Sequence, residues 1–327
     1  MATLAGKAVT KNGFGLMSTT ALPDEETFKV LKAALACGAN IWNGADFYGT
    51  PESNSLHLAN RYFTKYPEDA DKVVLCIKTG VVDMKTFKLD CSPQFMRQKA
   101  DELNKILDGK KTLDIFGPAR VDPDVPIERT MEGLAELLKE KKIGGIQLTE
   151  VRAETIRRAS NIAKVDMVEA EVSLWATEVF SNGVAETCGE LGILISAYTP
   201  LGAGMLTGQI KSLDDLPEND FHRMFPRFFP ENFEKNLDLV NEIQKLAKAK
   251  GCSPAQLAIS WVQSHNGKPG MPLVVPIAGA RSEERVRENC AEVQLDEKDL
   301  KEIQSILDSF PVAGARWPAG AAKFAEY

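Results

Sequence analysis

The stretch Asn40–Pro51 reads N-I-W-N-G-A-D-F-Y-G-T-P. Its apolar beginning predicts a short strand, and the glycines that follow predict a loop. This loop would present three polar side chains, those of Asn43, Asp46 and Tyr48, within one turn of each other. Because α/β barrels carry their chemistry on the loops that follow the strands, we expect a functional site here.

The next apolar run along the chain, Val73–Lys78, ends in a basic residue. A phenol is a weak acid, with an ordinary pKa of about 10. A tyrosine that donates a proton at neutral pH therefore needs a cation beside it, and Lys78 would supply that charge from the end of its strand. Taken alone, Tyr48 and Lys78 would more often be a tyrosine at the rim of a barrel and a surface lysine.

Short apolar runs alternate with longer stretches of helical periodicity along the 327 residues, a pattern typical of repeated βα units. We count eight such units, the number that closes a barrel. The sequence therefore predicts an α/β fold, a single (β/α)8 TIM barrel domain spanning residues 1–327. The expected strands lie near Gly13–Met17, Asn40–Trp42, Val73–Lys78, Thr112–Phe116, Ile143–Leu148, Asp166–Glu171, Ile193–Tyr198 and Met271–Pro276.

Four segments fall outside the eight repeats. Met1–Asn12 predicts either a hairpin that plugs the bottom of the barrel or a frayed terminus. Thr199–Lys235, a long Gly-, Pro- and Phe-rich loop after the seventh strand, would fold over a ligand or form a surface insertion. Asp296–Phe310 predicts an extra C-terminal helix on the outside of the barrel. The aromatic tail Pro311–Tyr327 either lines a pocket, with Trp317 as the candidate, or lies in solvent.

Composition argues against several classes of protein. The net charge is −7, from 39 basic and 46 acidic side chains, so we expect no nucleic-acid partner. Six scattered cysteines and three histidines form no metal-binding pattern. No apolar run reaches the roughly 18 residues of a membrane span, and the N-terminus lacks the apolar core of a secretory signal. We expect a protein without membrane contact, located in the cytoplasm, with the nucleus left open as a further location.

A nucleotide-binding Rossmann domain is not supported, because no G-x-G-x-x-G motif follows a strand. The eighth strand instead runs directly into a helix through the segment Val275–Asn289. A phosphate can bind at such a helix start, with Arg281 and Arg285 beside it. The alternative is an exposed helix face on which these arginines pair with neighbouring glutamates.

Several motifs in the correct order resemble the aldo-keto reductase superfamily, whose members are (β/α)8 barrels that bind NADPH without a Rossmann motif. The resemblance covers nearly the whole chain. The most specific pieces are W-N-G-A-D-F-Y-G at 42–49, Lys78 at a strand end, A-R-V-D-P at 119–123, A-E-T-I-R-R-A at 153–159, I-S-A-Y-T-P-L-G-A-G-M-L-T-G at 195–208, and I-A-G-A-R-S-E-E-R followed by E-N within 277–289.

The resemblance implies a catalytic tetrad of which this chain keeps half. The family's active-site tyrosine falls on Tyr48 and its lysine on Lys78. The family's aspartate falls on Asn43, and its histidine, from a pattern like H-R-x-D-P, falls on Ala119.

The resemblance also implies an NADPH site. Tyr198 would stack on the nicotinamide, and Leu201 and Gly202 would contact the pyrophosphate. The carboxamide-binding residues would be Thr149 and Glu150, with Glu169 where glutamine is usual. The contacts to the 2′-phosphate and adenine would come from Arg281, Ser282, Arg285, Glu288 and Asn289.

The two replaced tetrad positions suggest either a specialised reductase or a loss of catalysis. Asn43 can hydrogen-bond to Lys78 but supplies no counter-charge, so we expect burial to lower the pKa of Lys78. Alanine at position 119 removes a donor to the carbonyl oxygen and should leave room in the substrate pocket for a bulkier substrate.

N-G-x-x-F-Y-G together with A-R-V-D-P resembles the fungal pyridoxal reductase branch. This resemblance implies NADPH-dependent reduction of pyridoxal to pyridoxine, with Tyr48 as the proton donor, in a monomer or weak oligomer. Two alternatives stay open. One is a general aldehyde reductase, and the other is a non-catalytic NADPH-binding subunit like the related β subunits of potassium channels.

Overall fold

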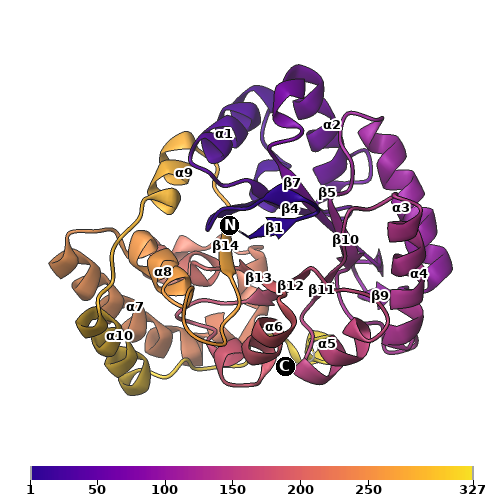
Figure 1. The fold of residues 1–327 in the computed structure, drawn as a ribbon. Helices are drawn as coiled ribbons and strands as arrows, with labels where there is room; N and C mark the ends of the chain where they lie inside the picture. Colours follow the sequence, from indigo (N-terminus) through magenta and orange to yellow (C-terminus); the bar gives the residue numbers. More distant parts are fainter. Residues whose placement is uncertain (1, 326–327) are drawn as a thin grey trace.

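In the computed structural model, which describes residues 2–325, eight parallel strands form one sheet that closes into a barrel. The strand order is β10-β7-β4-β3-β14-β13-β12-β11. Parallel bridges from Leu113 to Ile143 and from Phe116 to Ile146 join the two ends of this order. Figure 1 shows the strands at the centre and the helices in a ring around them. The predicted (β/α)8 fold is confirmed.

The barrel strands begin and end close to the predicted places, but several extend further along the chain. Their bounds are β3 Gly13–Gly15, β4 Ile41–Ala45, β7 Val74–Thr79, β10 Ile115–Pro118, β11 Gln147–Thr149, β12 Met167–Glu171, β13 Leu194–Tyr198 and β14 Val274–Ala278. Three antiparallel hairpins lie outside the barrel: β1 Thr3–Leu4 with β2 Lys7–Ala8, β5 Gly49–Thr50 with β6 Ser53–Asn54, and β8 Val81–Asp83 with β9 Lys88–Leu89.

The prediction that a loop begins at Asn43 is wrong, because strand β4 continues to Ala45. Gly44 therefore lies inside a strand rather than in a turn. A side chain there would come within 2.8 Å of Ser55 and 3.1 Å of Ile77. The glycine thus allows helix α2 (Ser55–Lys65) to pack closely on the barrel, and Asn43 is held rigidly in the sheet.

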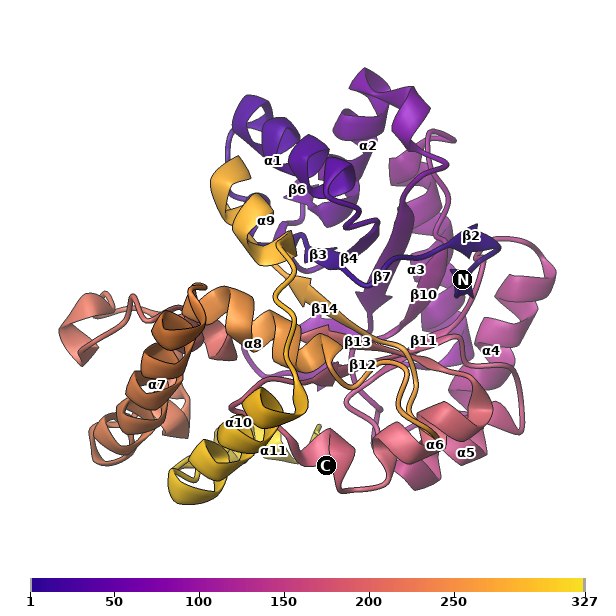
Figure 2. The ribbon, with the colours of Figure 1, turned by 60° about the vertical axis from the view of Figure 1, so that its left-hand side comes forward.

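The remaining helices surround the barrel or pack on its outside. Their bounds are α1 Asp24–Ala36, α3 Pro93–Leu107, α4 Ile127–Lys139, α5 Ala153–Ser160, α6 Val184–Leu191, α7 Pro230–Lys250, α8 Pro254–Gln263, α9 Glu283–Cys290, α10 Glu297–Ser309 and α11 Ala319–Ala322. The predicted extra helix is α10, which packs against α7 on the outside (Figure 2).

Helix α7 begins at Pro230, so the long connection after β13 is shorter than expected and ends before Lys235. It contains four short 3-10 helices, at Gly202–Thr207, Leu213–Asp215, Phe221–Met224 and Pro226–Phe228.

The N-terminal hairpin closes the bottom of the barrel, as one of the two predictions for this segment proposed. Leu4 and Val9 are buried and pack with Ile41, Val74 and Leu194. These three residues are the first or near-first residues of their strands, so the hairpin covers the amino-terminal end of the barrel.

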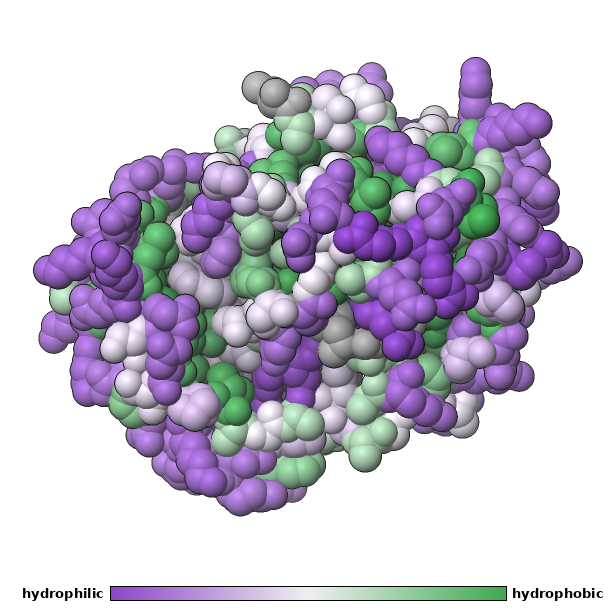
Figure 3. Space-filling model, turned by 60° about the horizontal axis from the view of Figure 1, so that its bottom comes forward, coloured by the Kyte–Doolittle hydropathy of each residue, from purple (hydrophilic) through white to green (hydrophobic). Residues whose placement is uncertain are grey.

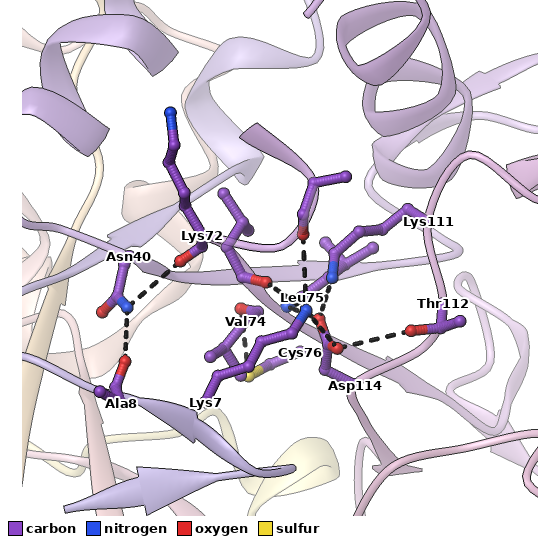
Figure 4. Close-up of polar contacts among 12 residues, drawn as sticks. Lys7, Ala8, Asn40, Lys72, Val74, Leu75, Cys76, Lys111, Thr112 and Asp114 are labelled. Carbon is purple, nitrogen blue, oxygen red and sulfur yellow. Dashed lines mark hydrogen bonds and ion pairs between the residues drawn. The ribbon is translucent and has the colours of Figure 1, made fainter. Parts of the chain in front are cut away.

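A buried cluster of two lysines and one carboxylate fastens this hairpin (Figure 4). Lys7 donates to Oδ1 of Asp114 at 2.9 Å and to the carbonyl oxygen of Val73 at 3.1 Å. Lys111 forms an ion pair with the other oxygen of Asp114, which also accepts from the backbone N–H of Leu75 at 2.8 Å. One carboxylate therefore compensates two buried or partly buried ammonium groups.

Among the described residues, seven large apolar side chains are exposed, those of Met17, Val82, Met84, Ile162, Leu191, Phe221 and Met224. Figure 3 shows one face on which hydrophilic residues predominate and hydrophobic residues form small, separated groups. Among residues 2–325, no helix is both long enough and apolar enough to cross a bilayer.

The C-terminal tail folds back onto the barrel. Asn236 of α7 exchanges two hydrogen bonds with the backbone of Ala313, of 2.9 and 2.7 Å. Phe324 packs on Phe87, with ring centroids 5.1 Å apart. Tyr327, part of the aromatic tail in the sequence, lies outside the described residues.

Replacing Asp114 with asparagine should leave Lys7 and Lys111 without their carboxylate. Removing one partner from a buried ion pair costs about 3–5 kcal/mol of unfolding free energy. Burial already lowers the pKa of Lys111 to about 8, despite the opposing effect of Asp114. Without Asp114 the pKa of Lys111 should fall further. Lys111 should then already be deprotonated in the folded protein at pH 8.

A folded-state pKa below the unfolded value makes the unfolding free energy rise with pH between the two values. The deficit of Asp114→Asn should therefore be largest near pH 6 and shrink toward pH 8 in urea unfolding. The matched control is Asp108→Asn, which removes a carboxylate from an exposed pair with Lys110 and should change stability little. Equal, small losses of unfolding free energy in Asp114→Asn and Asp108→Asn would contradict the role of Asp114 as the counter-ion of Lys7 and Lys111.

Candidate active site

A large cavity of about 890 Å³ opens at the carboxyl-terminal end of the barrel strands. Its floor contains side chains from the ends of several strands, including Lys78 of β7, Glu169 of β12 and Tyr198 of β13. The connection after β13 and the C-terminal tail form part of its wall. The volume lies within the range of ligand and cofactor sites.

Tyr48 and Lys78 meet in this cavity. Lys78 is buried, and its Nζ atom lies 4.7 Å from the centroid of the Tyr48 ring. Tyr48 follows β4 in a tight turn, in which its backbone N–H donates to the carbonyl oxygen of Ala45 at 3.4 Å. The sequence prediction that the tyrosine and the lysine lie together agrees with this geometry.

Asp46 does not contact the amine of Lys78. Its carboxylate accepts from the hydroxyl of Thr79 at 2.8 Å and lies 3.4 Å from Nζ of Lys99. Its carbonyl oxygen accepts from the side-chain amide of Asn54 at 3.0 Å. Asp46 therefore fastens the loop that carries Tyr48 to the neighbouring strand and helix.

Lys78 has a counter-ion that the sequence did not indicate. Its Nζ atom lies 3.0 Å from Oε1 of Glu169 and donates to Oδ1 of Asn43 at 2.7 Å. The amide nitrogen of Asn43 donates in turn to Oε2 of Glu169 at 2.7 Å. The three side chains form a closed triangle of short contacts.

The expectation that Lys78 lacks a counter-charge, and that its pKa is therefore lowered, is wrong. Burial lowers the pKa of Lys78, but the attraction of Glu169, together with interactions with Tyr48, outweighs burial, and the net shift is upward. The lysine is thus a stable cation beside the phenol. Sequence reasoning missed this pair because Lys78 lies on β7 and Glu169 on β12, two strands that are not neighbours in the barrel.

A second group of charges, centred on Arg316 of the tail, lies beside this triangle. The guanidinium of Arg316 contacts Glu150 at 2.7 Å and Glu171 at 3.3 Å. The hydroxyl of Tyr198 donates to the other oxygen of Glu150 at 2.7 Å. Arg316 therefore helps to fix Glu150, which in turn fixes the ring of Tyr198.

Glu171 and Arg316 were not among the sequence candidates. Residues two apart on a strand face the same side, so Glu171 faces the cavity as Glu169 does, and this spacing was an available signal. Burial raises the pKa of Glu171, and the attraction of Arg316 and Arg227 only partly offsets the effect. The sequence of the tail carries no comparable signal for Arg316.

Two candidate carboxamide-binding residues, Thr149 and Glu150, are not among the residues that line the cavity. Thr149 is buried, and its hydroxyl has no hydrogen-bond partner among the described residues. Glu150 is also buried and adopts a left-handed backbone conformation, with φ of 56°. Its carboxylate is held by the contacts with Tyr198 and Arg316 described above.

At the proposed substrate end, Trp317 lines the cavity but Ala119 does not. Ala119 is buried directly after β10, and its backbone N–H donates to the carbonyl oxygen of Thr79 at 2.7 Å. The neighbouring Arg120 lines the cavity instead, with its guanidinium carbon 5.1 Å from the centroid of the Trp317 ring.

The residues expected to bind the rest of a dinucleotide extend from the cavity floor to its rim. Leu201 and Gly202 line the cavity where Gly202, Ala203 and Gly204 are three consecutive residues in the left-handed backbone region. The backbone N–H groups of Gly202 and Gly204 donate to the carbonyl oxygens of Thr199 and Leu201 at 2.9 and 3.0 Å, so these two donors are already used within the loop.

The rim of the cavity is basic at the start of helix α9. The rim residues from this segment are Arg281, Arg285, Glu288 and Asn289. Ser282 caps the helix by accepting from the backbone N–H of Arg285 at 3.3 Å. Arg285 also pairs with Glu288 at 2.5 Å, so the glutamate pairing considered as an alternative is present as well.

Aromatic residues of the connection after β13 line the cavity, and that this connection folds over a ligand stays a prediction. Phe221, Phe225 and Phe228 all line it. Arg227 fastens the segment by donating to the carbonyl oxygen of Trp175 at 2.6 Å. Across residues 2–325, no group of three histidine, cysteine or acidic side chains is arranged to hold a metal ion.

Comparison with known proteins gives consistent matches along the chain. A model of the Aldo/keto reductase family matches residues 12–308. The chain is 36% identical over 318 residues to the probable pyridoxal reductase 2 of Schizosaccharomyces pombe, with 93% of each chain covered. It is 34% identical to the aldo-keto reductase yakc [NADP(+)] of the same yeast, with coverage of 94% and 92%.

Two further matches extend the comparison. The aldo-keto reductase str7 of Strobilurus tenacellus is 32% identical over 323 residues, which cover 94% of this chain and 92% of that one. The solved glycerol dehydrogenase AKR11B4 from Gluconobacter oxydans superposes with a TM-score of 0.81 over 94% of both chains. Its sequence identity is 22%, so this likeness is one of fold alone.

Replacing Arg316 with methionine should loosen the tail, because Glu150 and Glu171 lose their shared cation. We expect a loss of about 3 kcal/mol or more of unfolding free energy at pH 7. A carboxylate whose pKa is raised in the folded protein lowers the unfolding free energy at pH values where it is ionised. At low pH it is protonated in both states, and this destabilisation disappears. The deficit should therefore shrink toward pH 5.

Urea unfolding at several pH values measures this deficit, and limited proteolysis reports detachment of the tail. The matched control is Arg129→Met, since Arg129 forms an exposed pair with Glu132 and should contribute little. A pH-independent deficit in Arg316→Met would show that the carboxylates do not depend on Arg316.

Proposed function

Since the chain belongs to the aldo/keto reductase family of oxidoreductases, we propose that it reduces an aldehyde to an alcohol with NADPH. The observation that carries this proposal is the placement of Tyr48 beside a buried, charged Lys78 within one large cavity. A phenol next to a stable cation can give up its proton and remain as a phenolate.

Tyr48 would donate its proton to the carbonyl oxygen of the substrate. Lys78 would stabilise the phenolate that remains, because its ammonium group lies against the ring. When bound, NADPH supplies the hydride that the carbonyl carbon accepts. Asn43 holds Lys78 in place through its carbonyl oxygen.

The residues present fit NADPH. Tyr198 offers a ring whose hydroxyl is fixed by Glu150, and Leu201 and Gly202 line the cavity where we place the pyrophosphate. Arg281 and Arg285 are exposed at the rim, where they can pair with a 2′-phosphate. The buried hydroxyl of Thr149 lacks a hydrogen-bond partner among residues 2–325, so this group is available to a carboxamide although Thr149 does not line the cavity.

We propose pyridoxal as the substrate and pyridoxine as the product. The printed name of the yeast relative with 36% identity supports this choice. The cavity offers Trp317 and Phe225, with ring centroids 5.6 Å apart, near Arg120, and such aromatic walls suit a flat heteroaromatic ring. The phenolic oxygen beside the aldehyde of pyridoxal would offset the missing histidine at position 119.

A general aldehyde reductase and a non-catalytic NADPH-binding subunit are the competing functions. The preserved contact of Tyr48 with Lys78, and the counter-charge that Glu169 supplies, favour catalysis over binding alone. The three candidate functions can be separated by measuring the rate of NADPH oxidation from its absorbance, with pyridoxal and a small benzaldehyde as substrates. Preference for pyridoxal supports the proposal, equal rates favour a general reductase, and binding without turnover favours the subunit.

Tyr48→Phe should lower turnover by about 10²–10⁴-fold, the usual contribution of a general acid. Binding of NADPH, measured by fluorescence titration, should stay close to that of the unmodified chain, since only a hydroxyl is lost. The control is Tyr66→Phe, at the end of α2 and outside the cavity. Unchanged turnover in Tyr48→Phe would remove Tyr48 from the mechanism.

Arg285→Ala should weaken NADPH much more than NADH, because only NADPH carries the 2′-phosphate. A lost charge-assisted hydrogen bond costs about 1.5–3 kcal/mol, or roughly ten- to a hundredfold in Kd. Arg287→Ala is the control, since Arg287 lies on the same helix, pairs with Glu283 and does not line the cavity. Similar losses for both cofactors in Arg285→Ala would refute this role.

A further inference from the structure

We propose that Glu169 is a positioning residue that replaces the tetrad aspartate as the counter-ion of Lys78, so that charge and amide have exchanged places between positions 43 and 169. This inference rests on the reductase function proposed above. The resemblance places aspartate at 43 and glutamine at 169, whereas this chain has Asn43 and Glu169. At each of the two positions, the residue of this chain and the residue implied by the resemblance differ only in whether the side chain ends in a carboxylate or an amide.

The contacts show how the exchange works. Each oxygen of Glu169 has its own donor: Lys78 at 3.0 Å and the amide of Asn43 at 2.7 Å. Asn43 uses its carbonyl oxygen for Lys78 at 2.7 Å. All three side chains are buried, where an unpaired charge is costly. The lysine thus keeps both a negative charge and an oxygen partner.

Glu169 is therefore engaged with the lysine rather than free to hold a carboxamide, the role that the resemblance implies for this position. A carboxylate in this place also cannot donate a hydrogen bond, as an amide can. The protein keeps one negative charge beside the ammonium group, but this charge now comes from β12 instead of β4.

The titratable groups that face Lys78 are few. Glu169 faces it from β12, and Tyr48 faces it from the segment after β4. Cys76 lies two residues earlier on β7, and burial raises its pKa well above the ordinary value, so this thiol stays neutral. Glu169 is thus the anion on which the charged state of Lys78 depends.

The test is an exchange experiment with Glu169→Gln, Asn43→Asp and the double variant. Without its counter-ion, the buried ammonium should lose its proton at lower pH. In Glu169→Gln the basic limb of the pH profile of kcat/KM should therefore move down by about one unit or more. We expect kcat to fall about tenfold or more, with a smaller change in KM.

Asn43→Asp places a second carboxylate beside the lysine and should move the basic limb upward. In the double variant the negative charge returns through position 43. Its pH profile should lie within a few tenths of a unit of the original, and most of the lost kcat should return. If Glu169 had a purely structural role, adding Asn43→Asp to Glu169→Gln would restore neither the pH profile nor kcat.

Glu171→Gln is the matched control, because Glu171 lies on the same strand but pairs with Arg316. Whatever this change does to turnover, Asn43→Asp should not reverse it. Reversal there would overturn the proposal, since it would show that the rescue is not specific to the carboxylate beside Lys78.

Thermal unfolding of the chain without cofactor tests the ion pair independently of activity. Glu169→Gln should lower Tm by about 4–8 °C, as expected for a broken buried pair, and Asn43→Asp should restore at least half of this loss. If the unmodified chain is inactive with every aldehyde, the proposed function fails while this measurement still decides the ion pair.

If the unmodified chain is active but neither the pH limb nor Tm moves in Glu169→Gln, the counter-ion role is wrong and the function stands. Should Glu169→Gln alone fail to fold, the double variant is still expected to fold, because it restores the carboxylate. An unfolded double variant would overturn the inference.

Discussion

A buried ammonium group is unstable unless a negative charge lies beside it. The side chains at the carboxyl-terminal end of the barrel strands are arranged around that constraint. Lys78 must be inside the cavity to act on Tyr48, so it is removed from water. Glu169 supplies the charge and Asn43 orients both partners. The same requirement recurs at the opposite end, where Asp114 compensates Lys7 and Lys111. There, the ion pairs hold a structural plug instead of a proton donor.

The chain order of strands was predictable from the sequence because each strand is a short apolar run followed by helical periodicity. The residues near Tyr48 were predictable for a similar reason, since Lys78 follows on the adjacent strand. Glycine was a less reliable guide. Gly44 suggested a turn, but its small size serves the packing of α2 on β4.

The counter-ion of Lys78 was not predictable in this way. Asn43 and Glu169 are separated by 126 positions along the chain, and their contact depends on two strands that are not neighbours in the sheet. Periodicity reveals which residues of one strand face inward, but not which residues meet across the interior. The contacts of Arg316 with Glu150 and Glu171 were hidden for the same reason, because an irregular tail has no periodic pattern at all.

The position of the triangle also bears on how the molecule folds. Lys78 and Asn43 belong to the first four barrel strands in the sequence, and Glu169 belongs to the last four. A folding intermediate that contains only the first half of the barrel has no carboxylate to offer Lys78 from β12, so its ammonium group must stay hydrated. Burial of that group requires the second half of the barrel to dock, so closure of the barrel and neutralisation of the charge are coupled.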